Sequence, residues 1–248
     1  MRIPLTKSKE PKTASMTFFN HILELRRRIF ICILAVFVGA CIAYIFAPDL
    51  IKWIADFYIK ASNQKNAKLT QTSVLDGFML RIKVATYGGL VLASPVWLFQ
   101  LWRFVTPGLN PKEKKYAIPF ILSSILLFLG GGVISLFTLT KALDFLLSSG
   151  GVDYFEVINA SGYVSFVVLM FVAFGLSFEF PVLLIFLLIA RVIKTKQLSK
   201  WRRGAILIIV IFAAVITPSQ DPYSLFLMAV PMYIFYEASI LIGRILKR

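Results

Sequence analysis

The sequence predicts an all-α protein that spans a membrane six times, and three observations lead to this fold class. Apolar residues make up 58% of the chain and charged residues only 16%, which leaves too little polar surface for a soluble globular protein. The apolar residues fall into six long runs, and a helix needs roughly 20 such residues to cross a bilayer. Basic residues collect in alternate segments between these runs. We therefore expect one transmembrane domain over residues 1–248.

The first three runs are long enough to cross the membrane. They cover residues 29–47, 84–102 and 116–139. The first run exceeds the roughly 7–15 apolar residues of a signal-peptide core, so we expect a retained span and not a removed leader. The polar segment 1–28 precedes it. Segment 48–81 is the longest loop, and its mixture of aromatic and charged residues predicts short interfacial helices.

The last three runs are less regular. Residues 162–190 are long enough to span with a tilt or a kink. The runs 205–217 and 223–242 flank the turn TPSQDP, whose two prolines break helical hydrogen bonding. The fifth run rises only about 20 Å at 1.5 Å per residue, which is less than an average hydrocarbon core. It is therefore either one arm of a re-entrant hairpin or a short span in a thinned bilayer.

The distribution of lysine and arginine favours the short span. Of the 27 basic residues, 20 lie in the N-terminal segment, the loops 103–115 and 191–204, and the C-terminal segment, and seven lie in the other three connections. The positive-inside tendency places the first group in the cytoplasm. This alternation requires every run to cross, which predicts six spans with both termini inside. No internal repeat indicates a duplicated transporter.

One carboxylate falls inside a predicted span. Glu179 lies in FGLSFEFPVLL, about a dozen residues before the cytoplasmic Arg191. An ionised carboxylate near the bilayer centre costs about 2.5–3.5 kcal/mol, so an acid at this depth is a candidate for function. The alternative is a protonated carboxyl group that hydrogen-bonds to a neighbouring helix. Pro181 predicts a bend that opens backbone carbonyl groups beside the acid.

Acidic residues are scarce on the predicted cytoplasmic face. Only Glu10, Glu24 and Glu113 occur before and between the inner ends of the spans. A cationic partner is repelled by so basic a surface except where a carboxylate is held in place. Each glutamate also has a simpler interpretation. Glu24 lies four residues before Arg28 and can form an ordinary helical ion pair, and Glu113 can be a solvated charge between lysines.

Several classes of function lack their sequence signals. His21 is the single histidine, so a histidine metal site or a Ser-His-Asp arrangement is unsupported. The phosphate-binding patterns GxxxxGK and GxGxxG are missing, and the GGG stretch at 130–132 lies inside a span, where small residues let helices approach closely. The basic residues lie between apolar runs and not on one folded face, as nucleic-acid binding would require. We expect no enzyme, cofactor, metal or nucleic acid.

Four stretches together resemble the TatC family, the multispanning component of twin-arginine protein export. They are HILELRRR (21–28), ASPVWLFQLWRFVTPGLNPKEKK (93–115), FVAFGLSFEFPV (171–182) and ITPSQDPYSLFLMAVPMYIFYEASI (216–240). The resemblance implies six helices with short fifth and sixth spans and both termini in the cytoplasm. The outer loop departs from the family pattern with LDGFMLRIKV, and the last turn reads TPSQDP where TPPD is frequent.

The resemblance assigns a role to the scarce cytoplasmic acids. Glu24 and Glu113 match family glutamates that receive the paired arginines of a signal peptide. Two fixed carboxylates suit this task because each can bind one guanidinium group in bidentate geometry. Phe104 and Pro107 match positions that shape the same site, and Arg26 matches an arginine that positions Glu24.

The resemblance also implies partners within the membrane. Glu179 matches an intramembrane polar residue that engages single-span TatA/TatB-type helices, and Asp221 approximates an acid in the outer turn. The chain is then a twin-arginine signal-peptide receptor and the scaffold of a multi-subunit translocase for folded proteins, and its N-terminus favours a bacterial inner membrane. The alternative is a proton-coupled small-molecule transporter with Glu179 as the relay. A third, an intramembrane hydrolase, lacks a nucleophile and base at one depth.

Overall fold

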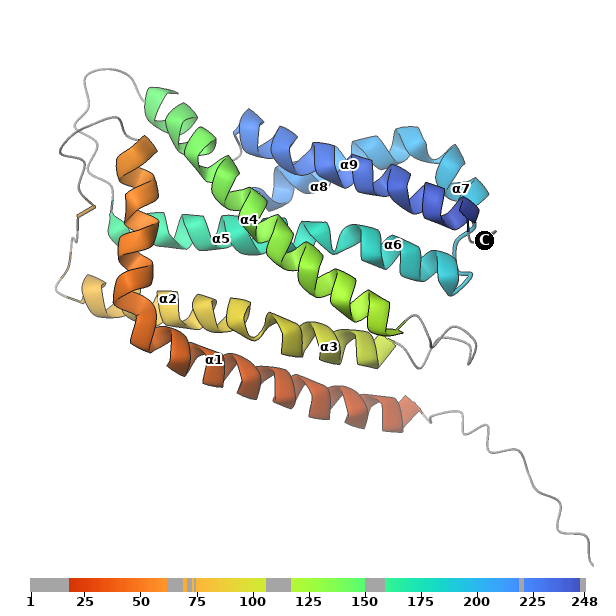
Figure 1. Cartoon of the computed structure of the whole chain (residues 1–248), viewed down its shortest axis with the longest axis horizontal. Helices are drawn as coiled ribbons and strands as arrows, with labels where there is room; N and C mark the ends of the chain where they lie inside the picture. The colour runs from red at the N-terminus through yellow and green to blue at the C-terminus, as the bar shows by residue number, and fades with distance from the viewer. Residues whose placement is uncertain are drawn as a thin grey trace, which may run out of the picture.

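The structure is a computed structural model that describes residues 18–61, 69–70, 73, 75–105, 117–149, 159–218 and 221–245. Every regular element in these residues is a helix, as predicted (Figure 1). The helices are α1 (Phe18–Ala61), α2 (Asp76–Leu92), α3 (Ser94–Val105), α4 (Ala117–Ser149), α5 (Ala160–Phe178), α6 (Phe180–Ile189), α7 (Thr195–Lys200), α8 (Arg202–Ile216) and α9 (Pro222–Ile245).

Four stretches are long and apolar enough to cross a membrane by themselves. They are His21–Ile59, Ala117–Leu146, Ala160–Ile189 and Pro222–Ile245. The bent pair α2 and α3 makes a fifth if it counts as one span. Helix α8 rises only about 22 Å at 1.5 Å per residue, so the predicted fifth span, at 205–217, stays a prediction, and with it the total of six.

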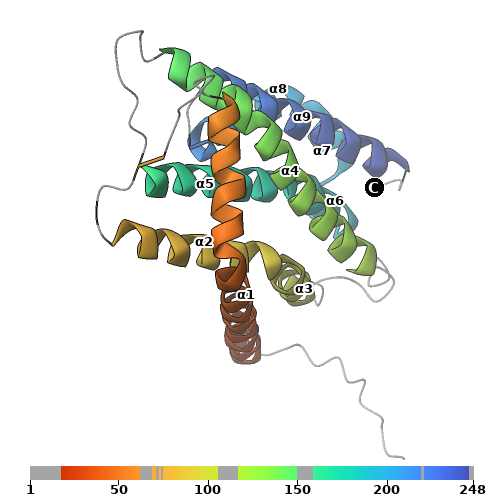
Figure 2. The same cartoon turned by 60° about the vertical axis from the view of Figure 1, so that its left-hand side comes forward.

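Helix α1 continues far beyond the predicted first span. Segment 48–81 was predicted to be a loop with short interfacial helices, but α1 extends to Ala61 and α2 already begins at Asp76. The outer part of α1 remains helical because it packs: Ile54 and Tyr58 are buried against α2, α4 and α5. Figures 1 and 2 show α1 turning part-way along its length, and Pro48 inside it removes one helical hydrogen bond.

The predicted second span, 84–102, is not one straight helix. Helices α2 and α3 meet at Ala93 with a bend of 50°. Pro95 has no backbone N–H to donate to the preceding turn. The Trp97 indole N–H donates instead to the carbonyl oxygen of Leu90 at 3.1 Å, which satisfies a carbonyl group at the break. Such local replacement allows a broken helix to lie within a bilayer.

The backbones of α1 and α2 touch at two glycines. A Cβ atom on Gly89 would lie 2.4 Å from the backbone nitrogen of Ala40, and one on Gly39 would lie 2.8 Å from the carbonyl oxygen of Gly89. Any larger residue would force the helices apart. This is the close approach that small residues permit between membrane helices.

The GGG stretch forms a second close contact, as predicted. A Cβ atom on Gly131 would lie 2.7 Å from the carbonyl oxygen of Phe174, and one on Gly132 would meet the ring of Phe171. Both partners belong to α5, and Figures 1 and 2 show α4 crossing α5 obliquely. The third glycine, Gly130, would meet no described atom within 4 Å.

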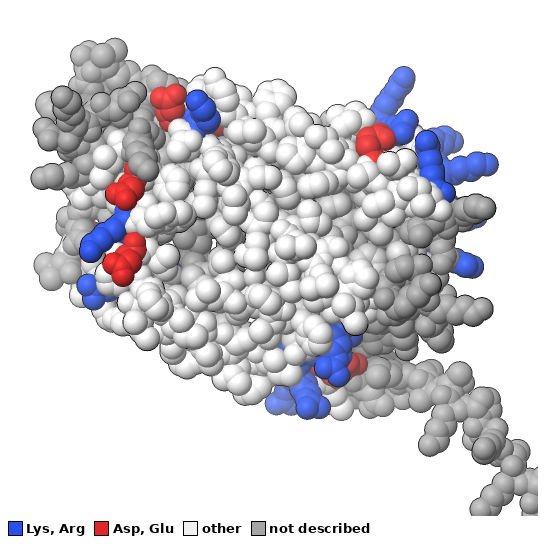
Figure 3. All heavy atoms as spheres, viewed as in Figure 1, with Lys and Arg blue, Asp and Glu red and all other residues white. Residues whose placement is uncertain are grey.

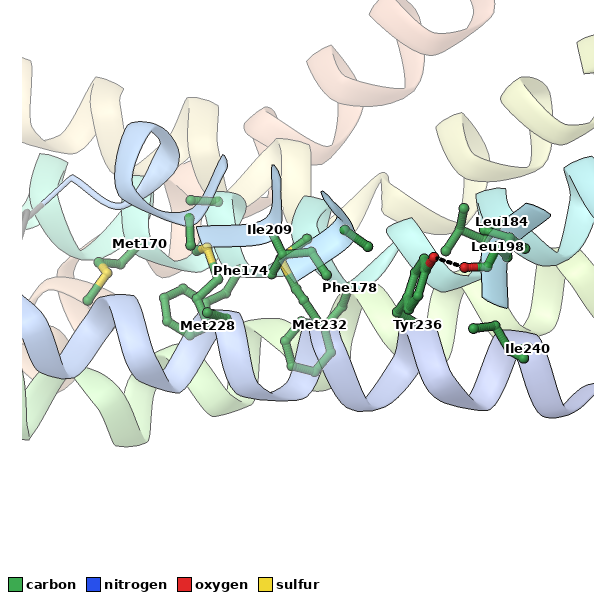
Figure 4. Close-up of a cluster of buried hydrophobic side chains, with 14 of the residues drawn as sticks. Met170, Phe174, Phe178, Leu184, Leu198, Ile209, Met228, Met232, Tyr236 and Ile240 are labelled. Carbon is green, nitrogen blue, oxygen red and sulfur yellow. Dashed lines mark hydrogen bonds between the residues drawn. The ribbon is translucent and has the colours of Figure 1, made fainter. Parts of the chain in front are cut away.

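Helices α5 to α9 enclose the largest apolar core (Figure 4). Phe174, Met228 and Met232 are almost completely buried within it. The Tyr236 hydroxyl lies in the same core and donates to the carbonyl oxygen of Leu198 at 2.7 Å. This bond ties α9 to the short helix α7.

Basic side chains gather at one end of the bundle, and a broad band without charge separates the two ends (Figure 3). At the end where α1 begins and α3, α6 and α9 finish, the described residues include eleven basic and two acidic side chains. The opposite end has four basic and five acidic ones. The eleven are Arg26, Arg27, Arg28, Arg103, Arg191, Lys194, Lys196, Lys200, Arg202, Arg203 and Arg244, and the two acids are Glu24 and Glu237.

The contact between α1 and α2 predicts the effect of one methyl group. We expect Gly89→Ala to lower the thermal unfolding midpoint of the purified protein in detergent, because overpacking costs about 1–3 kcal/mol. Gly130→Ala is the matched control, since its Cβ atom meets no described neighbour and alanine favours a helix over glycine by about 1 kcal/mol. Equal midpoints for the two variants would contradict the packing argument.

Candidate functional site

Glu24 lies between two contacts that join α1 to α3. Its Oε1 atom accepts hydrogen bonds from Nε of Arg28, at 3.0 Å, and from Nη2 of the same guanidinium. Nη1 of Arg28 donates across to Oε1 of Gln100 in α3 at 3.1 Å. One turn earlier, the ring of His21 stacks on that of Phe104 with centroids 4.3 Å apart. The carboxylate is therefore bonded to Arg28 on its own helix, and α3 holds it indirectly through Arg28.

One of the two carboxylate oxygens of Glu24 makes no hydrogen bond to the described residues. Its Oε2 atom is buried and has no hydrogen-bond partner in the part of the chain that the structure describes. Nδ1 of His21 lies 4.0 Å from this oxygen, which is too far for a hydrogen bond. A hollow of about 190 Å³ opens at this position. It is lined by Glu24, Arg27, Arg28, Ile31, Gln100 and Arg103.

The structure divides the predicted cytoplasmic site residues into three groups. Phe104 lies at the site through its stacking on His21. Arg26 is exposed on α1, and the guanidinium that pairs with Glu24 is that of Arg28, as in the simpler interpretation of Glu24. Pro107 and Glu113 lie outside the described residues.

Sequence reasoning missed Gln100, although a signal for it exists. Gln100 is a polar residue in the apolar run VWLFQLW, four residues before Phe104. Residues four apart lie on the same face of a helix. The amide of Gln100 and the ring of Phe104 therefore share one face of α3, and this pattern indicates that the face contacts polar groups of another helix.

Glu237 is the other described acid at this end, and its carboxylate is fully engaged. Its Oε2 atom accepts from Nη2 of Arg202 at 2.8 Å, and its Oε1 atom accepts from the Tyr233 hydroxyl at 3.2 Å. Both of its oxygens thus have partners within the chain. Glu24 differs in having a buried oxygen without one.

Glu179 lies at a one-residue interruption between α5 and α6. Its backbone remains near-helical, with φ −74° and ψ −19°, so Ala160–Ile189 is still a single candidate span. Pro181 occupies the first turn of α6, and the bend predicted beside the acid stays a prediction. The Oε1 atom of Glu179 is buried and has no hydrogen-bond partner among the residues described.

Polar groups of α3 and α4 lie beside Glu179. The Trp102 indole N–H donates to the Ser124 hydroxyl at 2.5 Å, and the Ser124 hydroxyl lies near the Glu179 carboxyl group. An indole can only donate, so the serine proton is available for the carboxyl group. Trp102 and Ser124 were not predicted as site residues. Ser124 looks from sequence like any small residue of a membrane helix.

Asp221 has a structural role that its sequence position only partly indicated. It is 2% exposed, and its Oδ1 atom accepts a hydrogen bond of 2.7 Å from the backbone N–H of Ser224. This is the bond of a helix N-cap, and Pro222 follows as the first residue of α9. The acid in the turn therefore starts the last helix.

Comparison with known proteins identifies the family. Residues 20–231 match the model of one family, the Sec-independent protein translocase protein (TatC). The chain belongs to the TatC family. A TatC protein from Carboxydothermus hydrogenoformans is 37% identical, over 94% of both chains. One from Aquifex aeolicus is 36% identical, over 94% of this chain and 97% of the relative, and one from Frankia casuarinae is 35% identical, over 96% and 68%.

Solved TatC structures share the fold. A crystal structure described as the twin arginine translocase receptor TatC superposes with a TM-score of 0.76 at 37% identity, and covers 92% of this chain and 100% of the solved one. A second, in DDM, gives a TM-score of 0.73 at 36% identity. Members of the TatC family are components of a protein translocase. The alternative of a small-molecule transporter is therefore not supported.

The capping bond of Asp221 predicts a stability difference between two conservative variants. Asp221→Ala removes the acceptor for Ser224 N–H and should lower stability by about 1 kcal/mol, whereas Asp221→Asn retains an acceptor oxygen and should lose only a small part of that. Thermal unfolding in detergent measures both. Equal losses for alanine and asparagine would show that the carboxylate charge, and not the cap, is what matters there.

Proposed function

We propose that the chain is the receptor subunit of a twin-arginine translocase and binds the paired arginines of signal peptides at Glu24. The observation that carries the proposal is the buried, unpartnered Oε2 atom of Glu24 beside a hollow at the basic end of the bundle. Two solved relatives at 37% and 36% identity are described as twin arginine translocase receptors.

The proposed orientation places the basic end in the cytoplasm of a bacterial cell, in its inner membrane. Eleven basic against two acidic described side chains at that end, and four against five at the other, follow the positive-inside tendency. With α8 as a short fifth span and the longer α9 as the sixth, both termini lie on the cytoplasmic side in this proposal. The hollow beside Glu24 then faces the compartment in which cargo is made.

Docking at Glu24 adds a guest without removing the resident guanidinium. Arg28 uses only Oε1 of the carboxylate and is also held by Gln100, so Oε2 remains available. A guanidinium group offers donors in a rigid fork and forms charge-assisted bonds to a carboxylate. Glu113 is proposed to receive the second arginine of the pair, with Phe104 and Pro107 shaping the site.

Glu179 is the proposed contact for single-span partner helices of the same translocase. An acid within a membrane span is expensive unless it is paired, and the Oε1 atom of Glu179 lacks a described partner. A polar group on an incoming helix would satisfy it. The bonded pair of Trp102 and Ser124 lies beside the carboxyl group and would help to orient it for this contact.

Binding of a twin-arginine signal peptide to the purified protein tests the receptor role. We expect Glu24→Gln to weaken binding at least tenfold, because a charge-assisted hydrogen bond contributes about 1.5–3 kcal/mol. Glu237→Gln is the matched control: it removes a carboxylate from the same basic end, but one whose oxygens are already engaged. Fluorescence anisotropy of a labelled peptide measures both.

A second peptide separates arginine recognition from general attraction. The same signal peptide with both arginines replaced by lysine keeps its charge but loses the bidentate fork. We expect it to bind the wild-type protein weakly, as the native peptide binds Glu24→Gln. Equal affinities for both peptides, or equal losses in the Glu24 and Glu237 variants, would exclude Glu24 as the arginine site.

The intramembrane contact predicts a different pattern. Glu179→Leu should abolish co-purification of single-span partners while signal-peptide affinity stays unchanged, because the two sites lie on different helices. Glu179→Gln keeps hydrogen-bonding capacity and should retain part of the association. Loss of signal-peptide binding in either variant would argue for a general folding defect and against a separate partner site.

A further inference from the structure

An apolar hollow lies between α1, α2, α4 and α5, in the half of the bundle opposite Glu24. Its volume is about 360 Å³, within the roughly 300–1,000 Å³ of small-molecule sites. Its walls carry almost no polar surface. The lining includes Phe46, Trp53, Tyr87, Val91, Val168 and Phe171.

Lys83 lies in line with this hollow, and two serines hold its ammonium group. Its Nζ atom donates to the Ser161 hydroxyl at 2.7 Å and to the Ser165 hydroxyl at 3.3 Å. Ser165 in turn donates to the carbonyl oxygen of Ser161. No carboxylate among the residues described lies within ion-pairing distance of Lys83. The cation is therefore fixed in position by neutral groups.

Helical spacing places Lys83 and its serines one turn away from residues that line the hollow. Tyr87 follows Lys83 by four residues on α2, and Val168 follows Ser165 by three on α5. Such spacings place residues on the same helix face, one turn apart. The hollow thus begins about one turn below the ammonium group and continues toward the middle of the bilayer.

A third helix, α1, contacts α5 beside the two serines. The Tyr163 hydroxyl in the first turns of α5 donates to the carbonyl oxygen of Ile54 at 3.1 Å. Its neighbour Trp53 lines the hollow and is 48% exposed. Tryptophan is enriched where membrane spans meet the headgroup layer. The polar end of the groove therefore lies at the interface and its apolar end lies within the hydrocarbon.

We propose that this groove binds one phospholipid, with its phosphate on Lys83 and Ser161 and an acyl chain in the apolar hollow. The ammonium group has a third N–H, and the Ser161 hydroxyl retains its own proton to donate. An ammonium group binds phosphate as a point charge. The backbone N–H groups of Ser161 and Gly162 are already bonded to Asn159, so recognition rests on the two side chains.

The shape of the groove favours a lipid over either of its parts. A free phosphate ester would leave the apolar hollow empty, and a hydrocarbon alone would leave the fixed cation without an anion. A phospholipid carries both groups, and its phosphate can reach Lys83 while its acyl chain fills the apolar hollow. Because the groove lies away from Glu24, this binding is separate from signal-peptide docking.

Titration of the delipidated, purified protein with phosphatidylglycerol, followed by native mass spectrometry, tests the proposal. We expect diacylglycerol of the same chains, which lacks the phosphate, to bind about tenfold more weakly, and glycerol 3-phosphate, which lacks the chains, to show no binding. Lys83→Gln, which can still bond to the serines, should reduce phosphatidylglycerol affinity to that of diacylglycerol. Lys83→Arg should restore it.

Two further variants make the result decisive. Lys141→Gln removes an exposed cation from the same end of the bundle and should leave affinity unchanged. Val168→Trp fills the hollow and should weaken phosphatidylglycerol and diacylglycerol alike. Equal affinity in the wild type, Lys83→Gln and Val168→Trp would overturn the proposal. So would loss of a co-purifying single-span partner in Val168→Trp with lipid affinity intact, since the groove would then be a helix-binding site.

Discussion

The backbone contact between α1 and α2 fixes the geometry on which the cytoplasmic site depends. Gly39 and Gly89 meet without side chains between them. Arg28 lies eleven residues before the first glycine and Gln100 eleven residues after the second. Eleven residues are about three helical turns, so similar lengths of chain lead from the glycine contact to both side chains, with the 50° bend at Ala93 lying between Gly89 and Gln100. The bond from Arg28 to Gln100, and with it the position of Glu24, follows from this register.

Most polar side chains inside the bundle are satisfied locally, which makes the exceptions informative. Several hydroxyl groups donate to a carbonyl oxygen three or four residues earlier in their own helix, the usual solution for serine and threonine in a membrane. Ser135, Thr138, Ser165, Ser177, Thr217 and Ser239 follow this pattern. Other side chains bond between helices, among them Trp102 to Ser124 beside Glu179 and the clasp of Lys83 by two serines. Polar contacts of this kind at membrane depth are costly to build and mark candidate sites.

The sequence predicted the helices well because a bilayer demands long apolar runs, but it predicted their ends less well. Run lengths indicate only the part of a helix that meets hydrocarbon, whereas α1 and α4 continue past 47 and 139 because buried partners support them. The break at Ala93 was missed since Pro95 is tolerated in many spans, and only the bond from Trp97 to Leu90 shows how this break is stabilised.

The prediction of site residues relied on residue types that are rare in their surroundings, and this signal misses residues of common types. Glu24 and Glu179 were predicted as site residues because acids stand out against a basic face and an apolar span, and their roles stay proposals. Gln100, Ser124 and Lys83 were missed because their importance comes from partners far away in the sequence. Arg26 was expected to position Glu24, but only the four-residue spacing of Arg28 brings a guanidinium onto the same helix face. Such pairwise geometry is decided by tertiary contact, which a single sequence does not contain.

The charges around Glu24 explain why a twin-arginine guest would need a second acid. Arg28 is only 12% exposed and nearly neutralises Glu24, so it serves as a fixed part of the wall. Arg27 and Arg103 are exposed and leave the hollow with surplus positive charge. At 4 Å each repels a guest guanidinium by about 1–4 kcal/mol, depending on solvent exposure. The Oε2 atom of Glu24 cannot offset both. A second carboxylate at Glu113 would restore the balance for two adjacent arginines, and a peptide with a single arginine would gain from only one of the two acids.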